Sequence, residues 1–212
     1  MKILFCRHGE SVENAKGRIA TAVNDAPLTK KGLKQTYAFI PIFKKYHVQK
    51  VYYSPKERAK KIGKIIDEKL NLPHELVPEL TERDWGIWGN LSWHEVSKKL
   101  DKLSIKKRYE MAPPKGESWE KFEKRLLKTI KKIENEAEKE GYDVVAIITH
   151  RGGLRALFPI LLKKSIKKHR EYSTDVGSIS IVNRIKNLHY SLSVLNVVPK
   201  KGGFSQKKRS KH

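Results

Sequence analysis

The sequence predicts an α/β fold with a mostly parallel sheet. Three short apolar runs, at 3–5, 51–53 and 143–149, have the length and the β-branched or aromatic content of buried strands. The stretches between them carry apolar residues at helical spacing. Strands that alternate with helices are typical of a sheet whose neighbouring strands run parallel.

The three apolar runs lead into residues that suit an anion. The first ends at Arg7-His8 and the third at His150, and Arg58 follows the second by about one helical turn. Ligands of an open α/β sheet bind at the carboxyl ends of its strands. If these strands are parallel neighbours, the four side chains meet at one edge. So much positive charge predicts a pocket for a phosphate dianion.

Length and charge limit the class of protein. The chain has 212 residues, enough for one α/β domain with a sizeable core. Its 46 Lys and Arg against 23 Asp and Glu give a formal net charge of +23. This charge is compatible with an anionic partner and shows no more than that, because a solvated Lys-rich surface explains most of the excess. No apolar run approaches the roughly 20 residues of a membrane helix, so we expect neither a membrane partner nor a signal peptide.

The single cysteine, Cys6, excludes an intrachain disulfide and fits a reducing, cytoplasmic location. Its place in the first apolar run predicts a small core residue. A phosphatase that uses a thiolate needs an arginine six positions later, where this chain has Val12. The sequence therefore argues against a cysteine nucleophile.

The first half of the chain is predicted as a loop and two helices. Residues 12–24 lack periodicity, and Asn14 and Arg18 are the candidate ligand-binding residues of this loop. Thr29 is a typical N-cap for a helix over 30–45, which Pro41 should kink. A second helix is predicted over 56–70. Arg58 lies in its first turn, where a cation opposes the helix dipole, and this position favours a ligand role.

The middle of the chain is predicted to cover the site. Residues 72–80 are an extended connection, and 83–115 form an insertion with a short helix over 93–103 that roofs the sheet edge. Its tryptophans could stack bases, but packing of the insertion onto the core is favoured. The candidate substrate contacts are Arg18, Arg83, Trp85, Lys107 and Arg108.

The last third is predicted to complete one domain over 1–198. Ser118 caps a long helix that ends near Glu140, and a further helix follows over 153–163. Strands over 178–182 and 192–198 finish the fold. The tail, 199–212, is basic and without acids, which predicts disorder. It could bind nucleic acid or an acidic membrane, but a solubilising role is at least as well supported.

Six motifs follow one another along the chain. They are Arg7-His8-Gly9-Glu10-Ser11 with Asn14, Leu28-Thr29-Lys30-Lys31-Gly32, Ser54-Pro55-Lys56-Glu57-Arg58-Ala59, Leu80-Thr81-Glu82, Gly116-Glu117-Ser118, and His150-x-Gly152 with Arg155-Ala156-Leu157. Together and in this order they resemble the histidine phosphatase superfamily, also called the phosphoglycerate mutase-like family. The resemblance covers nearly the whole chain except the tail. It implies a three-layer α/β/α sandwich with a mostly parallel sheet and a small helical insertion over the active site.

The resemblance also implies the catalytic roles. His8 is the nucleophile that becomes phosphorylated, Arg7, Arg58 and His150 clamp the phosphoryl oxygens with help from Asn14, and Glu82 exchanges the proton with the leaving oxygen and with water. Arginine forks suit phosphate oxygens, and nearby cations favour the neutral imidazole that can attack. This machinery requires no metal. Arg151 stands where the family usually has glycine, and Glu13 where mutases usually have tryptophan.

The family contains phosphatases and mutases, and we favour a phosphatase. The chain is shorter than typical mutases, and Pro114-Lys115-Gly116-Glu117-Ser118 resembles the compact phosphatase branch. Glu82-Arg83 and Lys107-Arg108 are mutase-like, and a mutase would need a 2,3-bisphosphoglycerate primer. A catalytically silent, basic nucleic-acid-binding protein is a further alternative. We expect a small phosphorylated substrate, no cofactor and no metal, while the sequence indicates no oligomeric state.

Overall fold

The computed structural model describes residues 1–18, 25–185 and 189–200, and its centre is a six-stranded sheet. The strands are β1 (Lys2–Arg7), β2 (Lys50–Tyr53), β3 (His74–Leu76), β4 (Val144–Thr149), β5 (Ile179–Ile185) and β6 (His189–Val197), in the order β3-β2-β4-β1-β5-β6. Neighbours from β3 to β1 are parallel, and β5 and β6 are antiparallel additions. The predicted parallel adjacency of the three apolar runs is therefore confirmed.

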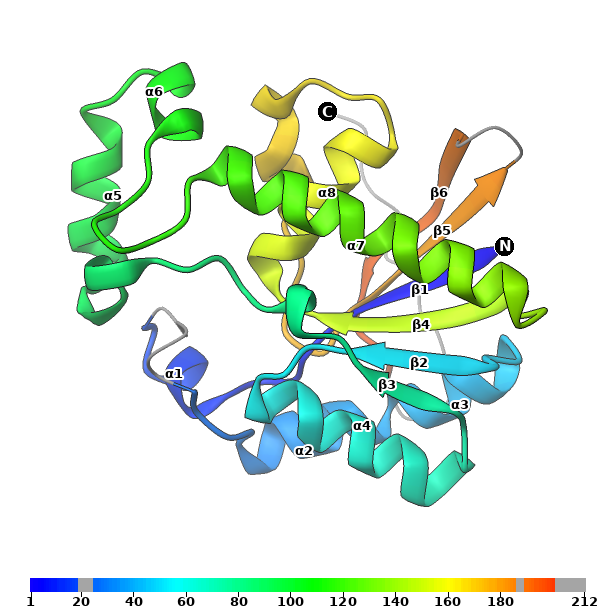
Figure 1. Ribbon diagram of the computed structural model, residues 1–212. Helices are drawn as coiled ribbons and strands as arrows, with labels where there is room; N and C mark the ends of the chain where they lie inside the picture. The colour runs from blue at the N-terminus through cyan, green and yellow to red at the C-terminus, as the bar shows by residue number, and fades with distance from the viewer. Residues whose placement is uncertain (19–24, 186–188, 201–212) are drawn as a thin grey trace.

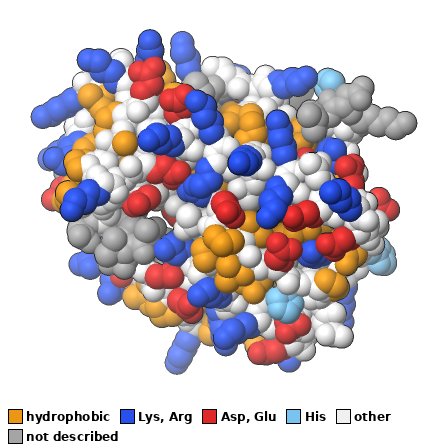
Figure 2. Space-filling model, viewed as in Figure 1, with side chains coloured by type: hydrophobic (Ala, Val, Ile, Leu, Met, Phe, Trp, Pro, Cys, Tyr) orange, Lys and Arg blue, Asp and Glu red, His pale blue; other side chains and the backbone are white. Residues whose placement is uncertain are grey.

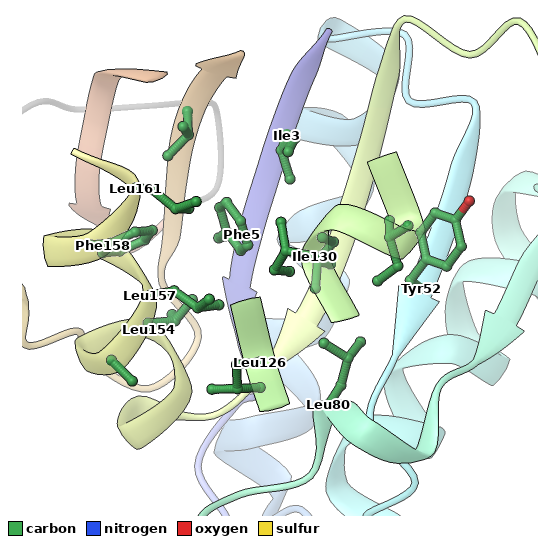
Figure 3. Close-up of a cluster of buried hydrophobic side chains, with 14 of the residues drawn as sticks. Ile3, Phe5, Tyr52, Leu80, Leu126, Ile130, Leu154, Leu157, Phe158 and Leu161 are labelled. Atoms are coloured by element: carbon green, nitrogen blue, oxygen red, sulfur yellow. The ribbon is translucent and has the colours of Figure 1, made fainter. Parts of the chain in front are cut away.

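Helices cover both faces of this sheet, as the predicted sandwich requires (Figure 1). One face carries α7 (Trp119–Lys139) and α8 (Arg151–Leu161). The other carries α2 (Lys30–Tyr37), α3 (Phe39–Lys45) and α4 (Glu57–Leu70). Because both faces are covered, successive residues of β1 enter opposite cores: Phe5 joins the α7–α8 cluster and Leu4 the α3–α4 cluster. Figure 3 shows the first cluster, in which Phe5 meets Phe158 edge to face at 5.5 Å.

The predicted helix over 30–45 is two helices that divide at Ala38. The cause is Pro41, which has no N–H to donate to the Tyr37 carbonyl four residues earlier. In α3 the proline falls in the first turn, where its missing donor costs nothing. Tyr37 consequently ends on the surface, 46% exposed.

Other elements also differ from the predictions. The strands predicted over 178–182 and 192–198 are β5, which extends to Ile185, and β6, which begins at His189. The loop after β1 contains a one-turn helix, α1 (Val12–Ala15), closed by a capping box between Ser11 and Asn14. Helix α8 begins at Arg151, two residues early, and the connection over 72–80 contains β3 and the 3₁₀ turn η1 (Pro78–Leu80). The connection between α8 and β5 contains η3 (Ile166–Tyr172). The added elements α1, β3, η1 and η3 are too short to show a period of their own in the sequence.

The insertion lies at the end of the sheet where the parallel strands finish (Figure 1). It consists of η2 (Gly86–Asn90), α5 (Trp93–Asp101) and α6 (Ile105–Glu110), so the predicted helix over 93–103 is shorter and a second helix follows it. Tyr109 of α6 donates a 2.6 Å hydrogen bond to Glu123 of α7, which ties the insertion to the main body.

The positive charge is dispersed over the face of the molecule shown in Figure 2. Figure 2 shows Lys and Arg side chains spread over this face with Asp and Glu among them. This distribution agrees with a solvated Lys-rich surface. None of the helices in the described residues is long and apolar enough to cross a membrane. Residues 201–212 of the predicted tail lie outside the described part of the chain.

Candidate active site

His8 lies directly after β1 and is 3% exposed. Its backbone N–H donates to the carbonyl of Thr149 at 3.2 Å, which fixes it against the end of β4. The ring Nδ1 lies 2.7 Å from the Gly9 carbonyl oxygen. Because a carbonyl only accepts, Nδ1 carries the proton and Nε2 keeps its lone pair. Arg58 Nε donates to that lone pair at 3.1 Å.

Arg58 joins both histidines from the first turn of α4, where it is 1% exposed. One terminal nitrogen donates to His150 Nδ1 at 3.1 Å, and the other pairs with Asp25 at 3.2 Å. His150 must then carry its proton on Nε2, which donates to Ser54 Oγ at 2.6 Å. The two imidazole rings are 5.2 Å apart. The sheet edge thus brings the four predicted residues together.

The cluster keeps both histidines neutral. Burial lowers the pKa of His8 well below its ordinary value, and the charges of Arg58 and Arg7 lower it further. Burial and Arg58 lower the pKa of His150 in the same way. Burial, followed by the charge of Arg151, lowers the pKa of Arg7 to about 10. The site is therefore a partly dehydrated cationic pocket in which a dianion would relieve repulsion.

One hydrogen-bond donor of Arg7 is unsatisfied in this pocket. One of its terminal nitrogens donates to the Thr174 carbonyl. Its Nε is buried and has no hydrogen-bond partner within the described residues. A buried donor without a partner is costly, and an anion beside it would remove that cost.

Glu82 approaches the same pocket from the segment after η1. The hydroxyl of Thr149 holds that segment by donating to the Leu80 carbonyl at 3.1 Å. The Glu82 carboxylate accepts the backbone N–H of Gly152 at 3.0 Å and that of Arg83 at 2.9 Å. A Cβ at position 152 would lie 2.2 Å from Glu82 Oε1, so the glycine is what lets the carboxylate occupy this position. We call Arg7, His8, Arg58 and Glu82 the phosphoryl pocket.

The phosphoryl pocket opens into a cleft of about 1380 Å³ beneath the insertion. Of the predicted site residues, the cleft is lined by Arg7, His8, Asn14, Arg18, Arg58, Glu82, Arg83, Trp85 and Arg108. Lys107 borders a separate hollow on α6. His150 does not line the cleft and is 1% exposed, so in this state it orients Arg58 and presents no free ring nitrogen to the cleft.

Arg83 and Trp85 build the wall of the cleft. Arg83 is 3% exposed and donates to the carbonyls of Glu117 at 2.9 Å and Met111 at 3.4 Å. Its guanidinium lies 4.4 Å from the Trp85 ring and 5.6 Å from that of Trp119. Trp85 is 8% exposed, which agrees with the favoured packing role for this tryptophan.

The sequence reasoning missed several residues in and around the cleft. Asp25 accepts from Arg58 and from the N–H of Glu57 at 3.0 Å, so it caps α4 from 32 residues upstream. No local pattern marks such a distant cap. The segment around η3 carries no motif either, although it also reaches the cleft. The missed lining residues include Trp119, Lys167, Arg170 and Asp175. Arg151, noted as a departure from the family pattern, and Arg155, part of a family motif, also line the cleft.

Two further groups bear on the chemistry. No set of three His, Cys, Asp or Glu side chains in the described residues could hold a metal ion. Cys6 is completely buried in β1, and burial raises the pKa of its thiol far above the ordinary value. The thiol therefore stays protonated, in agreement with its predicted place in the core.

Comparison with known proteins gives the family. The histidine phosphatase superfamily (branch 1) matches residues 3–197. The chain is 29% identical to 6-phosphofructo-2-kinase/fructose-2,6-bisphosphatase 1 of Mus musculus over 77% of its own length and 33% of that protein, so it spans a third of that relative. It is 32% identical to the metal-independent phosphoserine phosphatase of Arabidopsis thaliana, over 74% of this chain and 67% of the relative.

A solved structure agrees with this assignment at the level of the fold. The alpha-ribazole phosphatase of Shigella flexneri superposes with a TM-score of 0.78 at 24% identity, over 94% of this chain and 98% of that one. The phosphatase names of these proteins agree with the predicted class of enzyme. Because the family's profile matches nearly the whole described chain, the protein belongs to the histidine phosphatase superfamily, branch 1.

Proposed function

We propose that the protein hydrolyses small phosphomonoesters through a phosphohistidine formed on Nε2 of His8. The observation that carries the proposal is the tautomer of His8. The Gly9 carbonyl holds the proton on Nδ1, so the Nε2 lone pair is available, and the Arg58 guanidinium marks where phosphoryl oxygens would sit. A neutral, buried imidazole beside two arginines is suited to attack a phosphate dianion.

The proposed reaction has two steps. In the first, His8 Nε2 bonds to phosphorus, the bond to the ester oxygen breaks, and Glu82 gives its proton to that oxygen. In the second, Glu82 takes a proton from water, whose oxygen bonds to phosphorus as the P–N bond breaks. Arg7 and Arg58 stabilise the charge on the equatorial oxygens. His150 holds Arg58 in place. The proposal uses no metal and no cofactor.

The wall of the cleft supports a phosphatase over a mutase. Arg83, which is mutase-like, donates its hydrogen bonds to the carbonyls of Glu117 and Met111 in the cleft wall. Of the basic pair on α6, Lys107 lies outside the cleft, and Arg108 is held by the Leu103 carbonyl at 2.9 Å and by Asp101 at 3.3 Å. These groups are occupied in supporting the insertion. The phosphatase names of the relatives point the same way.

The test is phosphate release from a panel of phosphomonoesters with a chelator present. The panel includes phosphoserine and 3-phosphoglycerate, and isomerisation to 2-phosphoglycerate is followed with and without a bisphosphate primer. We expect hydrolysis that His8→Ala lowers by roughly 10³-fold or more. The matched control is His94→Ala, because His94 is an exposed histidine of α5.

Three results would contradict the proposal. Turnover of His8→Ala within a few-fold of wild type, with a native circular dichroism spectrum, would exclude the covalent mechanism. Primer-dependent isomerisation that far exceeds hydrolysis would identify a mutase. Absence of any turnover, together with RNA binding that falls steeply with salt, would favour the nucleic-acid-binding alternative.

A further inference from the structure

A second group of cations lines the cleft beside the phosphoryl pocket. Arg151 and Arg155 lie on the first two turns of α8, and Lys167 and Arg170 lie on η3. Arg151 Nε donates to the hydroxyl of Ser173, the residue that follows η3, at 2.9 Å. The two segments therefore meet in one wall of the cleft.

A tryptophan of α7 backs this wall. The Arg155 guanidinium lies 5.8 Å from the Trp119 ring, which lies 5.7 Å from the His169 ring of η3. Trp119 Nε1 donates to Glu123 at 2.8 Å, so the ring is fixed. An aromatic plane that is held in this way restricts the motion of the arginine next to it.

These four cations have no ion-pair partner in the part of the chain that the structure describes. Each acidic residue that lines the cleft has another partner: Glu10 pairs with Lys31, Asp101 with Arg108, Asp175 with Asn196, and Glu82 with backbone N–H groups. None of the four cations forms an ion pair within residues 1–18, 25–185 and 189–200. The remaining residues contain neither Asp nor Glu. The charge of Glu82 acts on Arg155 without forming an ion pair, so all four cations can still pair with an anion from another molecule.

Arg151 links this group electrostatically to the phosphoryl pocket. The pKa of Arg7 is lowered to about 10, mainly by burial and next by the positive charge of Arg151. Burial, Arg151 and Arg170 lower the pKa of Arg155 to about 10 as well. Arg155 Nε is buried and has no hydrogen-bond partner within the described residues. The charges of Arg151 and Arg170 therefore act on Arg155, and that of Arg151 also acts on Arg7.

We propose that Arg151, Arg155, Lys167 and Arg170 form a second anion subsite, so that the preferred substrate carries a phosphate or carboxylate group in addition to the phosphate that is cleaved. This inference rests on the proposed phosphatase function and names its substrate class. Arginine forks accept either anion through paired hydrogen bonds. Arg151, where the family resemblance implies a glycine, is the member of this subsite whose charge also acts on Arg7.

The test compares substrates that differ only in the second anion. The bisphosphates of propane-1,3-diol, butane-1,4-diol and hexane-1,6-diol are compared with the corresponding monophosphates, and 3-phosphoglycerate with glycerol 3-phosphate. The three diols sample different spacings between the subsites. The measured quantity is the ratio of kcat/KM within each pair. We expect wild type to prefer the doubly anionic member by about tenfold or more at one spacing.

The proposed subsite is removed in a triple variant, Arg151→Gln/Lys167→Gln/Arg170→Gln. This variant keeps Arg155, which is partly buried. We expect its preference ratio to fall close to one. The control is Lys168→Gln, because Lys168 is exposed on the same 3₁₀ helix but does not line the cleft. A wild-type ratio near one at every spacing would overturn the proposal. An unchanged ratio in the triple variant would do the same.

Calorimetry separates failure of this inference from failure of the proposed function. Propane-1,3-bisphosphonate and propylphosphonate are titrated into wild type and the triple variant, with no turnover required. Tighter binding of the bisphosphonate that the triple variant loses supports the subsite even if no phosphomonoester is hydrolysed. Equal binding of both probes, alongside hydrolysis that depends on His8, rejects the subsite and keeps the phosphatase.

Discussion

Gly152→Ala tests the role of Glu82 without touching the carboxylate itself. Gly152 is the second residue of α8, and its N–H donates to Glu82 Oε2 at 3.0 Å. An added Cβ would lie 2.2 Å from Glu82 Oε1 and 2.9 Å from its Cδ, closer than atoms approach. Restoring ordinary contact requires the carboxylate to move by about 1 Å. The obstacle is the end of a flexible side chain, so the helix can remain in place.

The expected loss concerns catalysis more than folding. A displacement of about 1 Å costs roughly 10²-fold in rate, within the 10²–10⁴-fold that a general acid contributes. Turnover of alkyl phosphates, whose leaving oxygen needs a proton, should fall by about 10²-fold. p-Nitrophenyl phosphate releases a stable anion, so its first turnover should persist as a burst before slow hydrolysis of the phosphohistidine. The melting temperature should hold or rise, since alanine favours a helix by up to about 1 kcal/mol over glycine.

The neighbouring Gly153→Ala is the matched control. A Cβ at Gly153 would meet Thr149 Oγ1 at 3.1 Å and Leu126 at 3.6 Å and would not touch Glu82, so any loss it causes measures displacement passed on through the Thr149–Leu80 hydrogen bond. It should therefore leave alkyl phosphate turnover within a few-fold of wild type. An equal loss in both variants, or retained alkyl phosphate turnover in Gly152→Ala, would refute the assignment of Glu82 as proton donor.

Two further predictions follow from the buried charges. Because His8 and His150 have folded-state pKa values well below their ordinary values, the unfolded chain binds more protons below about pH 6.5. The free energy of unfolding should therefore fall with pH from 6.5 downward, and in denaturant titrations His8→Ala should show a shallower decline. Asp25→Asn keeps an acceptor for Arg58 and should lower kcat/KM by less than about threefold, whereas Asp25→Ala should lower it about tenfold. Equal losses in the two variants would rule out a positioning role for Asp25.

The meeting of Arg7, His8, Arg58 and His150 could be predicted because it depends only on local signals. Each residue follows a short apolar run, and the carboxyl ends of parallel strands share one edge. The long helix α7 could also be predicted from the sequence. Ser118 is its N-cap, and its apolar residues keep the helical period over 21 residues. Here local propensity and tertiary packing agree.

The residues that were missed depend on contacts between distant segments. Asp25 reaches α4 across 32 residues, and Arg151 reaches Ser173 across 22. Neither pair leaves a periodic trace in the sequence. The sequence predicted that Pro41 would kink the helix but not that the helix would divide at Ala38. A proline is tolerated in the first turn of a helix, so the chain starts a second helix that has Pro41 in its first turn.

The protonation state of His8 follows from how Arg58 is buried. A guanidinium that is 1% exposed needs partners for its N–H groups, and Asp25 supplies only one of them. The lone pairs of His8 Nε2 and His150 Nδ1 satisfy two others without adding charge. Protonating His8 would remove one of these acceptors and place a third cation beside Arg7 and Arg58. The packing that satisfies the arginine is therefore the packing that keeps Nε2 able to attack phosphorus.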